Sequence, residues 1–411
     1  MLETPAPATD KIAVASWARS IRRSALQDML AMAARPNILS FALGLPASEL
    51  FPVEQYSEAA AHVLATDRRA LQYQPPHAAL KRHVVALMRQ RGVLCDERQV
   101  FLTAGAQQGM NLLARVLLNQ RGLVLMEDLA YTGFQQVVAP YQPEVLTVPT
   151  DTETGIDVDA VESLLRSGAR PALIYIVTDG HNPLGVSMAK EKRIHLVRLA
   201  RRFRVPIVED DAYGLLHYEG ASLKPLRAFD GEWVCYVGSF SKILAPALRV
   251  GWLVVPESLL DALSVVKEST DINTSTFAQR TVAAFLDAGH LPAHLSMLRR
   301  EYRARRDAMN RALGEHFPAE ARWTLPENGL FIWVTLPEGM DAGELMQRAV
   351  EQEEVAFIPG HAFSVKDPQR GANCMRLNFS NCDAARIEDG VRRLGRVLKS
   401  AMPQAAASAA P

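Results

Sequence analysis

The sequence predicts an α/β protein whose large domain has a mostly parallel sheet covered by helices on both faces. Short apolar runs alternate with amphipathic stretches between residues 100 and 208, the pattern of parallel strands joined by crossover helices. From Ala284 on, the pattern changes to a long charged helix followed by mixed strands and helices. We therefore expect a smaller α+β domain made from the N-terminal segment and the C-terminal third, with boundaries at 1–52, 53–285 and 286–411.

Apolar runs bounded by turn residues predict the strands, and apolar residues repeating every three to four positions predict the helices. The predicted strands begin at residue 38 and then lie at 100–103, 123–126, 145–148, 172–177, 206–208, 233–237, 250–255, 329–335 and 375–379. The predicted helices lie at 20–34, 55–66, 78–91, from 104–110 to about 118, and at 131–139, 158–167, 190–203, 294–312, 342–353 and 383–400.

The composition indicates a soluble globular protein that binds a small molecule. The 411 residues are 48% hydrophobic, and 45 basic side chains balance 45 acidic ones, so no overall charge attracts nucleic acid or an anionic membrane. The four cysteines have neither metal-type nor redox-type spacing, which favours a reducing cytoplasm and no metal site. We find no secretion signal and no apolar run long enough to span a membrane.

A polar turn lies between the two apolar runs at 233–237 and 250–255. It carries Ser239, Ser241, Lys242 and Arg249. A lysine held near a strand end can be desolvated, and its amine then becomes a nucleophile for a carbonyl, as Schiff-base enzymes require. The serines and the arginine would supply donors to a nearby anion. A surface turn is the alternative, and the spaced arginine and flanking strands argue against it.

Other candidate side chains also follow predicted strands, where ligand sites of parallel sheets gather. Tyr131, Asn182 and Asp210 each lie just after a strand. Gly105, Ala106 and Gln107 form a strand-to-helix turn that would let backbone N–H groups approach a phosphate. Each has a structural alternative: a core aromatic for Tyr131, an ordinary Asn-Pro turn for Asn182, a helix N-cap for Asp210, and a glycine turn without a ligand.

Two more residues stand out by their surroundings. Arg376 lies inside an apolar strand, and a buried guanidinium is costly without an anionic partner. That partner is either a protein carboxylate or a bound anion. Tyr73 precedes Pro75 and Pro76 at a stiff, exposed corner, which suits a side chain that reaches outside its own domain.

Taken together, these motifs resemble those of the pyridoxal-phosphate-dependent class I/II aminotransferases, the fold type I enzymes of the aspartate aminotransferase superfamily. The matching segments run from about residue 20 to about residue 400. They are E-D-L-A-Y-T-G ending at Gly133, H-N-P-L-G ending at Gly185, D-D-A-Y ending at Tyr213, S-F-S-K ending at Lys242, and R-L-N-F-S ending at Ser380. The 2-aminoadipate and kynurenine aminotransferases are the most similar group, because S-F-A-L-G-L-P and E-L-F-P follow their N-terminal loop. Leu43 replaces a glycine usual in that loop.

The resemblance implies a role for each candidate residue. Lys242 would form a Schiff base with pyridoxal 5'-phosphate, Asp210 would face its pyridinium nitrogen, and Tyr213 and Asn182 would donate to its ring oxygen. Tyr131 would stack on the ring, and Arg376 would bind the substrate α-carboxylate as a fork. The phosphate would be bound by Gly105, Ala106, Gln107, Ser239, Ser241, Arg249 and, from the other subunit of a homodimer, Tyr73. Gly44, Asn182 and Gln27 would contact the substrate.

The implied activity is transfer of an amino group between an L-amino acid and a 2-oxo acid. Elimination, oxidation or cyclisation with the same cofactor is the alternative, since the lysine motif is shared. A regulatory domain fused to a DNA-binding module is a third possibility, but only about twenty residues precede the fold. Gln27 is uncharged where the group often has an arginine, so we expect an amino donor with a neutral or aromatic side chain.

Overall fold

The computed structural model describes residues 12, 14–20, 35 and 37–402. A short helix, α1 (Ser16–Ser20), ends where the first predicted helix was expected to begin. The rest of that helix, and with it Gln27, lies outside the described residues. None of the described helices is both long and apolar enough to cross a membrane.

The large sheet has seven strands. Because most neighbouring strands are parallel, the segments that follow them lie at the same end of the sheet. Strand β10 is antiparallel to both of its neighbours, and the other neighbouring pairs are parallel. In spatial order the strands are β2 (Val100–Thr103), β10 (Gly251–Val254), β9 (Val234–Ser239), β8 (Ile207–Asp211), β7 (Leu173–Ile176), β3 (Leu123–Glu127) and β4 (Glu144–Val148). The predicted α/β fold with a mostly parallel sheet is confirmed.

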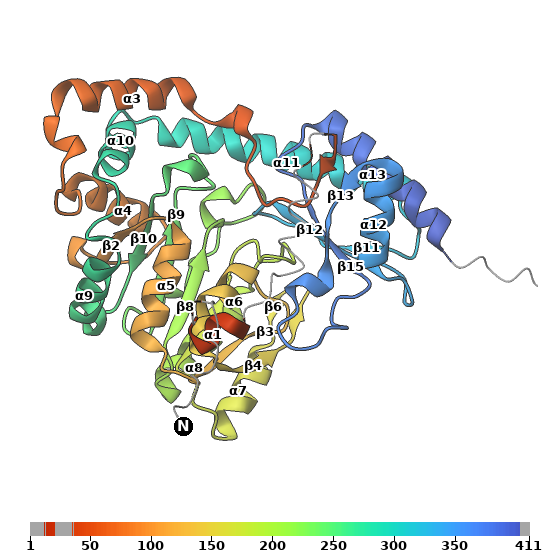
Figure 1. Ribbon diagram of the computed structural model, residues 1–411, viewed down its shortest axis with the longest axis horizontal. Coiled ribbons are helices and arrows are strands. Elements are labelled where there is room, and N and C mark those ends of the chain that lie inside the picture. Colours follow the sequence, from red (N-terminus) through yellow and green to blue (C-terminus); the bar gives the residue numbers. More distant parts are fainter. Residues whose placement is uncertain (1–11, 13, 21–34, 36, 403–411) are drawn as a thin grey trace, which may run out of the picture.

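Helices cover both faces of this sheet, because its central strands are apolar on both sides (Figure 1). On β7, Leu173 and Tyr175 join the core under one set of helices, and Ile174 and Ile176 join the core under the other. The first set is α5 (Ala106–Leu117), α6 (Thr132–Val138) and α9 (Leu260–Asp271), and the second is α7 (Val158–Arg166) and α8 (Lys190–Phe203). This part also contains α3 (Val53–Thr66), α4 (Ala78–Gln90), α10 (Thr276–Asp287) and the short pair β5 (Thr150–Asp151) and β6 (Gly155–Ile156), besides several short 3-10 helices.

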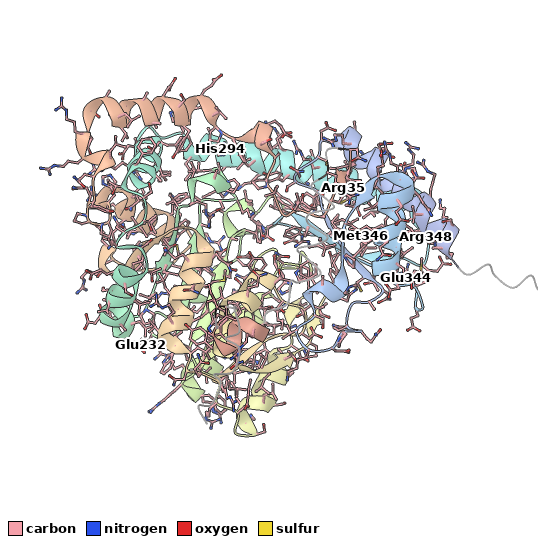
Figure 2. The ribbon with its side chains drawn as sticks, viewed as in Figure 1. Arg35, Glu232, His294, Glu344, Met346 and Arg348 are labelled. Atoms are coloured by element: carbon pink, nitrogen blue, oxygen red, sulfur yellow. The ribbon has the colours of Figure 1, made fainter. Side chains whose placement is uncertain are left out.

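The C-terminal third forms a second sheet with its own helices. The strands, in spatial order, are β11 (Arg322–Trp323), β12 (Phe331–Thr335), β15 (Cys374–Asn378) and β14 (Ile358–Pro359). The helices are α11 (Leu291–His316), α12 (Ala342–Glu353) and α13 (Ala384–Ala401). Met346 on α12 is buried in this part, whereas Glu344 on the same helix is exposed (Figure 2).

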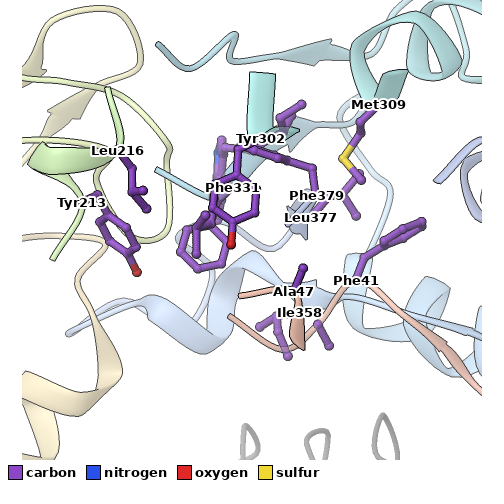
Figure 3. Close-up of a cluster of buried hydrophobic side chains, with 14 of the residues drawn as sticks. Phe41, Ala47, Tyr213, Leu216, Tyr302, Met309, Phe331, Ile358, Leu377 and Phe379 are labelled. Carbon is purple, nitrogen blue, oxygen red and sulfur yellow. The ribbon is translucent and has the colours of Figure 1, made fainter. Parts of the chain in front are cut away.

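The N-terminal segment joins the C-terminal third, as predicted. Strand β1 (Leu39–Ser40) pairs in parallel with β13 (Val355–Ala356). Figure 3 shows Phe41 and Ala47 beside side chains from β12, β14 and β15. We propose domain boundaries near residues 52 and 285, because α3 begins at Val53 and α10 ends at Asp287.

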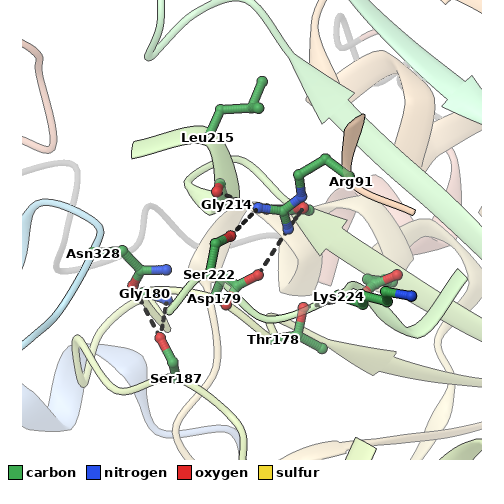
Figure 4. A network of polar contacts seen from close by, with 12 residues as sticks. Arg91, Thr178, Asp179, Gly180, Ser187, Gly214, Leu215, Ser222, Lys224 and Asn328 are labelled. Atoms are coloured by element: carbon green, nitrogen blue, oxygen red, sulfur yellow. Dashed lines mark hydrogen bonds and ion pairs between the residues drawn. The ribbon is translucent and has the colours of Figure 1, made fainter. Parts of the chain in front are cut away.

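A buried network of charges fixes the loops that follow β7 and β8 (Figure 4). Arg91, at the end of α4, donates to Asp179 at 3.0 Å and to Asp211 at 2.8 Å, and it also bonds the carbonyl of Gly214. Arg193 on α8 donates to the other oxygen of Asp179 at 2.7 Å. Each charge in the network therefore has a partner of opposite sign, which a buried ion requires.

Replacing Arg91 with methionine should strongly destabilise the fold. The change leaves Asp211 buried without a cation and Asp179 with only one, and breaking such a pair costs about 3–5 kcal/mol. The midpoint of urea unfolding should fall accordingly. Arg89→Met, at an exposed position of the same helix, is the control and should change stability by less than about 0.5 kcal/mol. Equal midpoints for the two variants would contradict this account of the network.

Candidate active site

A cavity of about 590 Å³ lies at the carboxyl end of the parallel strands. Its volume falls within the usual range for small-molecule and cofactor sites. The predicted residues that line it are Gly44, Ala106, Gln107, Tyr131, Asn182, Asp210, Tyr213, Ser239, Ser241, Lys242, Arg249 and Arg376. The structure therefore brings together side chains from both sheets and from the N-terminal segment.

Lys242 follows β9, in the turn that leads to β10. Its ammonium donates to the carbonyl oxygen of Gly44 at 2.8 Å, which ties the N-terminal segment to the turn. Desolvation by the cavity walls, with the positive charges of Arg376 and Arg249 adding to it, lowers the pKa of Lys242 to about 8. A lysine in this environment yields more neutral amine near neutral pH than an exposed one.

Asp210 ends up on the cavity side of β8, and it is buried. One carboxylate oxygen, Oδ2, accepts a hydrogen bond from the hydroxyl of Tyr175 at 2.9 Å. The other, Oδ1, is also buried and has no hydrogen-bond partner among the described residues. Burial raises the pKa of Asp210 to about 6 despite this hydrogen bond and the charge of Lys242.

The helix-cap alternative for Asp210 is excluded by its neighbour. Side chains alternate along a strand, so Asp211 points away from Asp210. Asp211 accepts from the backbone N–H of Gly214 at 2.7 Å and bonds Arg91. Asp211 thus satisfies the turn after the strand, and Asp210 is left facing the cavity.

Arg376 is buried without a carboxylate partner among the described residues. Its guanidinium donates to Asn182 Oδ1 at 2.7 Å and to the carbonyl of Ala42 at 2.6 Å. The rings of Phe331 and Phe363 lie 4.2 and 4.7 Å from it, centroid to Cζ. The described residues thus argue against the salt-bridge alternative, and among them the guanidinium Nε has no hydrogen-bond partner.

Asn182 is oriented by this contact. Because Arg376 can only donate, the oxygen of the amide must face the guanidinium, and the amide NH2 is the group that Asn182 can offer to a ligand. The Asn182–Pro183 peptide bond is cis. Next to it, His181 is paired with Glu127 across 2.8 Å, so this imidazole is bound inside the protein.

The start of α5 has the features of an anion site. The helix has no side-chain cap, so its first N–H groups are not satisfied by a neighbouring residue. Gly105 has a positive φ of 84°, and a Cβ there would lie 2.5 Å from the Arg249 guanidinium. Glycine at this position thus permits the arginine to approach the helix start, where Arg249 donates to the carbonyl of Ala104 at 2.9 Å. Ser239 and Ser241 lie across the same end of the cavity and are hydrogen-bonded to each other at 3.0 Å.

Two tyrosines form aromatic walls of the cavity. Tyr131 immediately precedes α6, and its ring packs so closely on Gly133 that a side chain at that position would overlap it. Tyr213 is buried and meets Phe331 edge to face, with centroids 6.1 Å apart. Burial raises the pKa of both hydroxyls, so both stay protonated and able to donate.

Some lining residues were not predicted, and two predicted residues, Gly105 and Tyr73, do not line the cavity. Phe331 and Met110 line the cavity without having been predicted as site residues. Phe331 lies in the predicted strand 329–335, and only its pairing with the strand of Arg376 brings it to the site. Further unpredicted lining residues include Thr132, Gln136, Val177, Ala212 and Pro246. Tyr73 does not line the cavity of its own chain; its side chain is 78% exposed.

Comparisons with known proteins agree with this geometry. The profile of the aminotransferase class I and II family matches residues 36–394. The chain is 35% identical over 394 residues to aromatic-amino-acid aminotransferase 1 of Thermococcus litoralis, with 94% of each chain covered. It is 39% identical over 386 residues to 2-aminoadipate transaminase of Thermus thermophilus, covering 92% of this chain and 94% of the relative. A solved structure of Pyrococcus horikoshii kynurenine aminotransferase in complex with PMP matches with a TM-score of 0.89 at 34% identity, covering 95% and 98%.

The chain therefore belongs to the class I and II aminotransferases. It is a transaminase that depends on pyridoxal phosphate, as the motifs predicted. When bound, the cofactor supplies an aldehyde that reacts with amines and a ring that accepts electrons from the substrate Cα. The cavity suits it, because the uncapped helix start fits a phosphate and the free oxygen of Asp210 fits a protonated ring nitrogen.

In cofactor-free protein, acetylation of Lys242 should show a pH midpoint of about 8. Only the neutral amine reacts. Because the pKa of Lys242 is lowered from the ordinary 10.5, the neutral amine forms at a pH about two to three units lower than for an exposed lysine. Mass spectrometry of the peptide containing Lys242 measures the rate. In urea the midpoint should return towards 10.5, and an unchanged midpoint on unfolding would contradict the effect of the cavity.

Proposed function

We propose that this transaminase binds its cofactor covalently through Lys242 and its amino-acid substrate through Arg376. The observation that carries the proposal is the meeting of three groups in one cavity: an amine of lowered pKa, a buried carboxylate with an unpartnered oxygen, and a buried guanidinium without a carboxylate. The amine matches the aldehyde of the cofactor, the carboxylate its protonated ring nitrogen, and the guanidinium the carboxylate of an amino acid.

The proposed roles follow from the contacts of each side chain. Asp210 holds a proton on the ring nitrogen, and the amide of Asn182 and the hydroxyl of Tyr213 donate to the ring oxygen. Tyr131 covers the ring face. The phosphate is bound by the start of α5 (Gly105, Ala106, Gln107) together with Ser239, Ser241 and Arg249. Arg376 binds the carboxylate of the substrate. Gly44 lies next to the reacting amine, because its carbonyl accepts a hydrogen bond from Lys242.

We favour transamination over elimination, oxidation or cyclisation because the relatives are named as aminotransferases of aromatic amino acids, 2-aminoadipate and kynurenine. We also propose a cytoplasmic location, because all four cysteines are free thiols, which suits a reducing compartment.

Borohydride reduction of the purified protein should fix the cofactor on the peptide that contains Lys242. For Lys242→Ala, we expect cofactor to remain bound through the phosphate and ring contacts while turnover falls by at least about 1,000-fold, since the amine also moves the substrate proton. Peptide mass spectrometry and steady-state kinetics provide the two readouts. A reduced adduct on another lysine would disprove the assignment.

We further propose a homodimer in which Tyr73 completes the phosphate site of the partner subunit. Tyr73 and its neighbour Leu71 are largely exposed, and Ile272 is an exposed apolar residue of an adjoining loop. The two loops are joined by a hydrogen bond of 2.7 Å from Asn273 to the carbonyl of Gln74. Arg249 is also exposed in the single chain, so the phosphate end of the cavity has room for a residue from outside.

Hybrid dimers test this arrangement. A Lys242→Ala subunit and a Tyr73→Ala subunit should both be poorly active alone, but mixing them should restore part of the activity. In the hybrid, the site that retains Lys242 receives the intact Tyr73 of the other subunit. Sedimentation of the wild-type protein as a fully active monomer, or mixtures with only additive activity, would contradict the proposal.

The cavity also bears on substrate choice. Its lining cations are Lys242, Arg249 and Arg376, and each already has a proposed role, so no further cation of the described lining remains for a second carboxylate. Leu43, Met110 and Phe331 make much of the remaining wall apolar. We therefore propose that the preferred amino donor has a neutral or aromatic side chain.

Steady-state kcat/KM for a panel of amino acids measures this preference. Leucine, methionine or phenylalanine should match or exceed 2-aminoadipate and glutamate, because burying an uncompensated carboxylate is costly. If kcat/KM for an acidic donor were more than about tenfold higher, a difference of about 1.4 kcal/mol, the proposal would be wrong. A cation outside the described lining would then have to bind the side-chain carboxylate.

A further inference from the structure

A buried tyrosine stands behind the carboxylate of Asp210. Tyr175 on β7 is directly opposite Val208 on β8, and Asp210 lies two residues further along β8, so all three side chains share one face of the sheet. The Tyr175 hydroxyl donates to Asp210 Oδ2 at 2.9 Å. This is the only hydrogen bond that the Asp210 carboxylate makes with the described residues.

The tyrosine is held rigidly and has no access to a ligand. Its side chain is 2% exposed and does not line the cavity. Its ring stacks on Phe134 of α6, with centroids 3.7 Å apart and planes within 3° of parallel. Tyr175 can therefore influence chemistry in the cavity only through Asp210.

The hydrogen bond has two effects on the carboxylate. It fixes Oδ2, which leaves Oδ1 as the oxygen available to another group. It also opposes the effect of burial, because a donor to the charged form of a carboxylate lowers its pKa. The hydroxyl itself stays protonated, since burial and the adjacent carboxylate raise the pKa of Tyr175 well above its ordinary value.

We propose that Tyr175 is a positioning residue that keeps Asp210 ionised and directs its free oxygen to the pyridine nitrogen of the cofactor. This inference rests on the proposed role of Asp210. Without the hydroxyl, the carboxylate binds a proton more readily and is free to rotate, so the ring nitrogen keeps its own proton less firmly.

The chain offers a matched control on the neighbouring strand. Tyr236 of β9 is buried to the same degree, and its hydroxyl donates to Asp211 Oδ2 at 2.9 Å. Asp211 has further partners in Arg91 and the N–H of Gly214, and it faces away from the cavity. Tyr236→Phe thus removes the same group from an adjacent carboxylate without changing Asp210.

The experiment reconstitutes wild type, Tyr175→Phe and Tyr236→Phe with cofactor labelled with 15N in the pyridine ring. The nitrogen chemical shift reports its protonation directly. We expect a protonated nitrogen in wild type and in Tyr236→Phe, and a markedly smaller protonated fraction in Tyr175→Phe. The dissociation constant of the cofactor should rise about tenfold in Tyr175→Phe alone, as expected for loss of a hydrogen bond to a charged group. Its kcat should fall with little change in KM.

A second variant separates the effect of the Tyr175 hydroxyl from the effect of the packing around its ring. Phe134→Leu keeps the hydroxyl but removes the ring stacked on it, and it should reduce the protonated fraction by less than Tyr175→Phe does. A wild-type nitrogen shift in Tyr175→Phe, or an equal change in Tyr236→Phe, would overturn the role of Tyr175 alone. An unprotonated nitrogen in wild type would instead overturn the role of Asp210, and with it this inference.

Discussion

The burial of Asp210 and Arg376 in one cavity, each without a bonded opposite charge among the described residues, is the constraint on which the site depends. Other buried ions of the described residues are paired with an opposite charge or, as for Glu209 and Arg227, bond backbone groups away from the cavity. Arg91 and Arg193, for example, share Asp179, and Arg91 also bonds Asp211. The contrast indicates that the unpaired charges of the cavity are matched to a ligand rather than to the fold.

Two of the three lining cations also hold the N-terminal segment. Arg376 bonds the carbonyl of Ala42, and Lys242 bonds that of Gly44. The segment is anchored behind these contacts by the pairing of β1 with β13 and by Phe41 in the core. One short stretch therefore connects the turn after β9 with the strand β15 of the second sheet. A charged ligand that takes over these two cations competes with neutral backbone carbonyls, which bind a cation less strongly than a carboxylate does.

Local patterns were enough to predict much of the fold. The bounds of β2, α8 and α12 agree with the prediction to the residue, because their apolar periodicity is uninterrupted and their burial follows it. No element was predicted for residues 260–287, where α9 and α10 form. Tyr131, Asn182, Asp210 and Lys242 were predicted together because each lies at or after the end of a strand of the large sheet. Arg376 was predicted instead from its apolar surroundings, since it lies inside β15 of the second sheet.

Contacts between segments far apart in the sequence could not be predicted from such local patterns. The hydrogen bond from Tyr175 to Asp210 depends on the register of β7 against β8, which no single segment specifies. The same holds for Gly44 with Lys242 and for Phe363 on the guanidinium of Arg376. The bond of Asp211 to Arg91, 120 residues away in the sequence, is another such contact.

The stability of Asp210→Asn, measured without and with cofactor, tests most directly whether the charge in the cavity serves a ligand. The raised pKa corresponds to about 3 kcal/mol at neutral pH, so the cofactor-free variant should unfold at a higher urea concentration than the wild type. The gain should vanish as the pH falls through about 6 towards 3.8, because the folded wild type then binds its proton first. With saturating pyridoxal phosphate, the order should reverse. A loss of several kcal/mol in the cofactor-free variant would instead identify Asp210 as a structural charge and contradict the account.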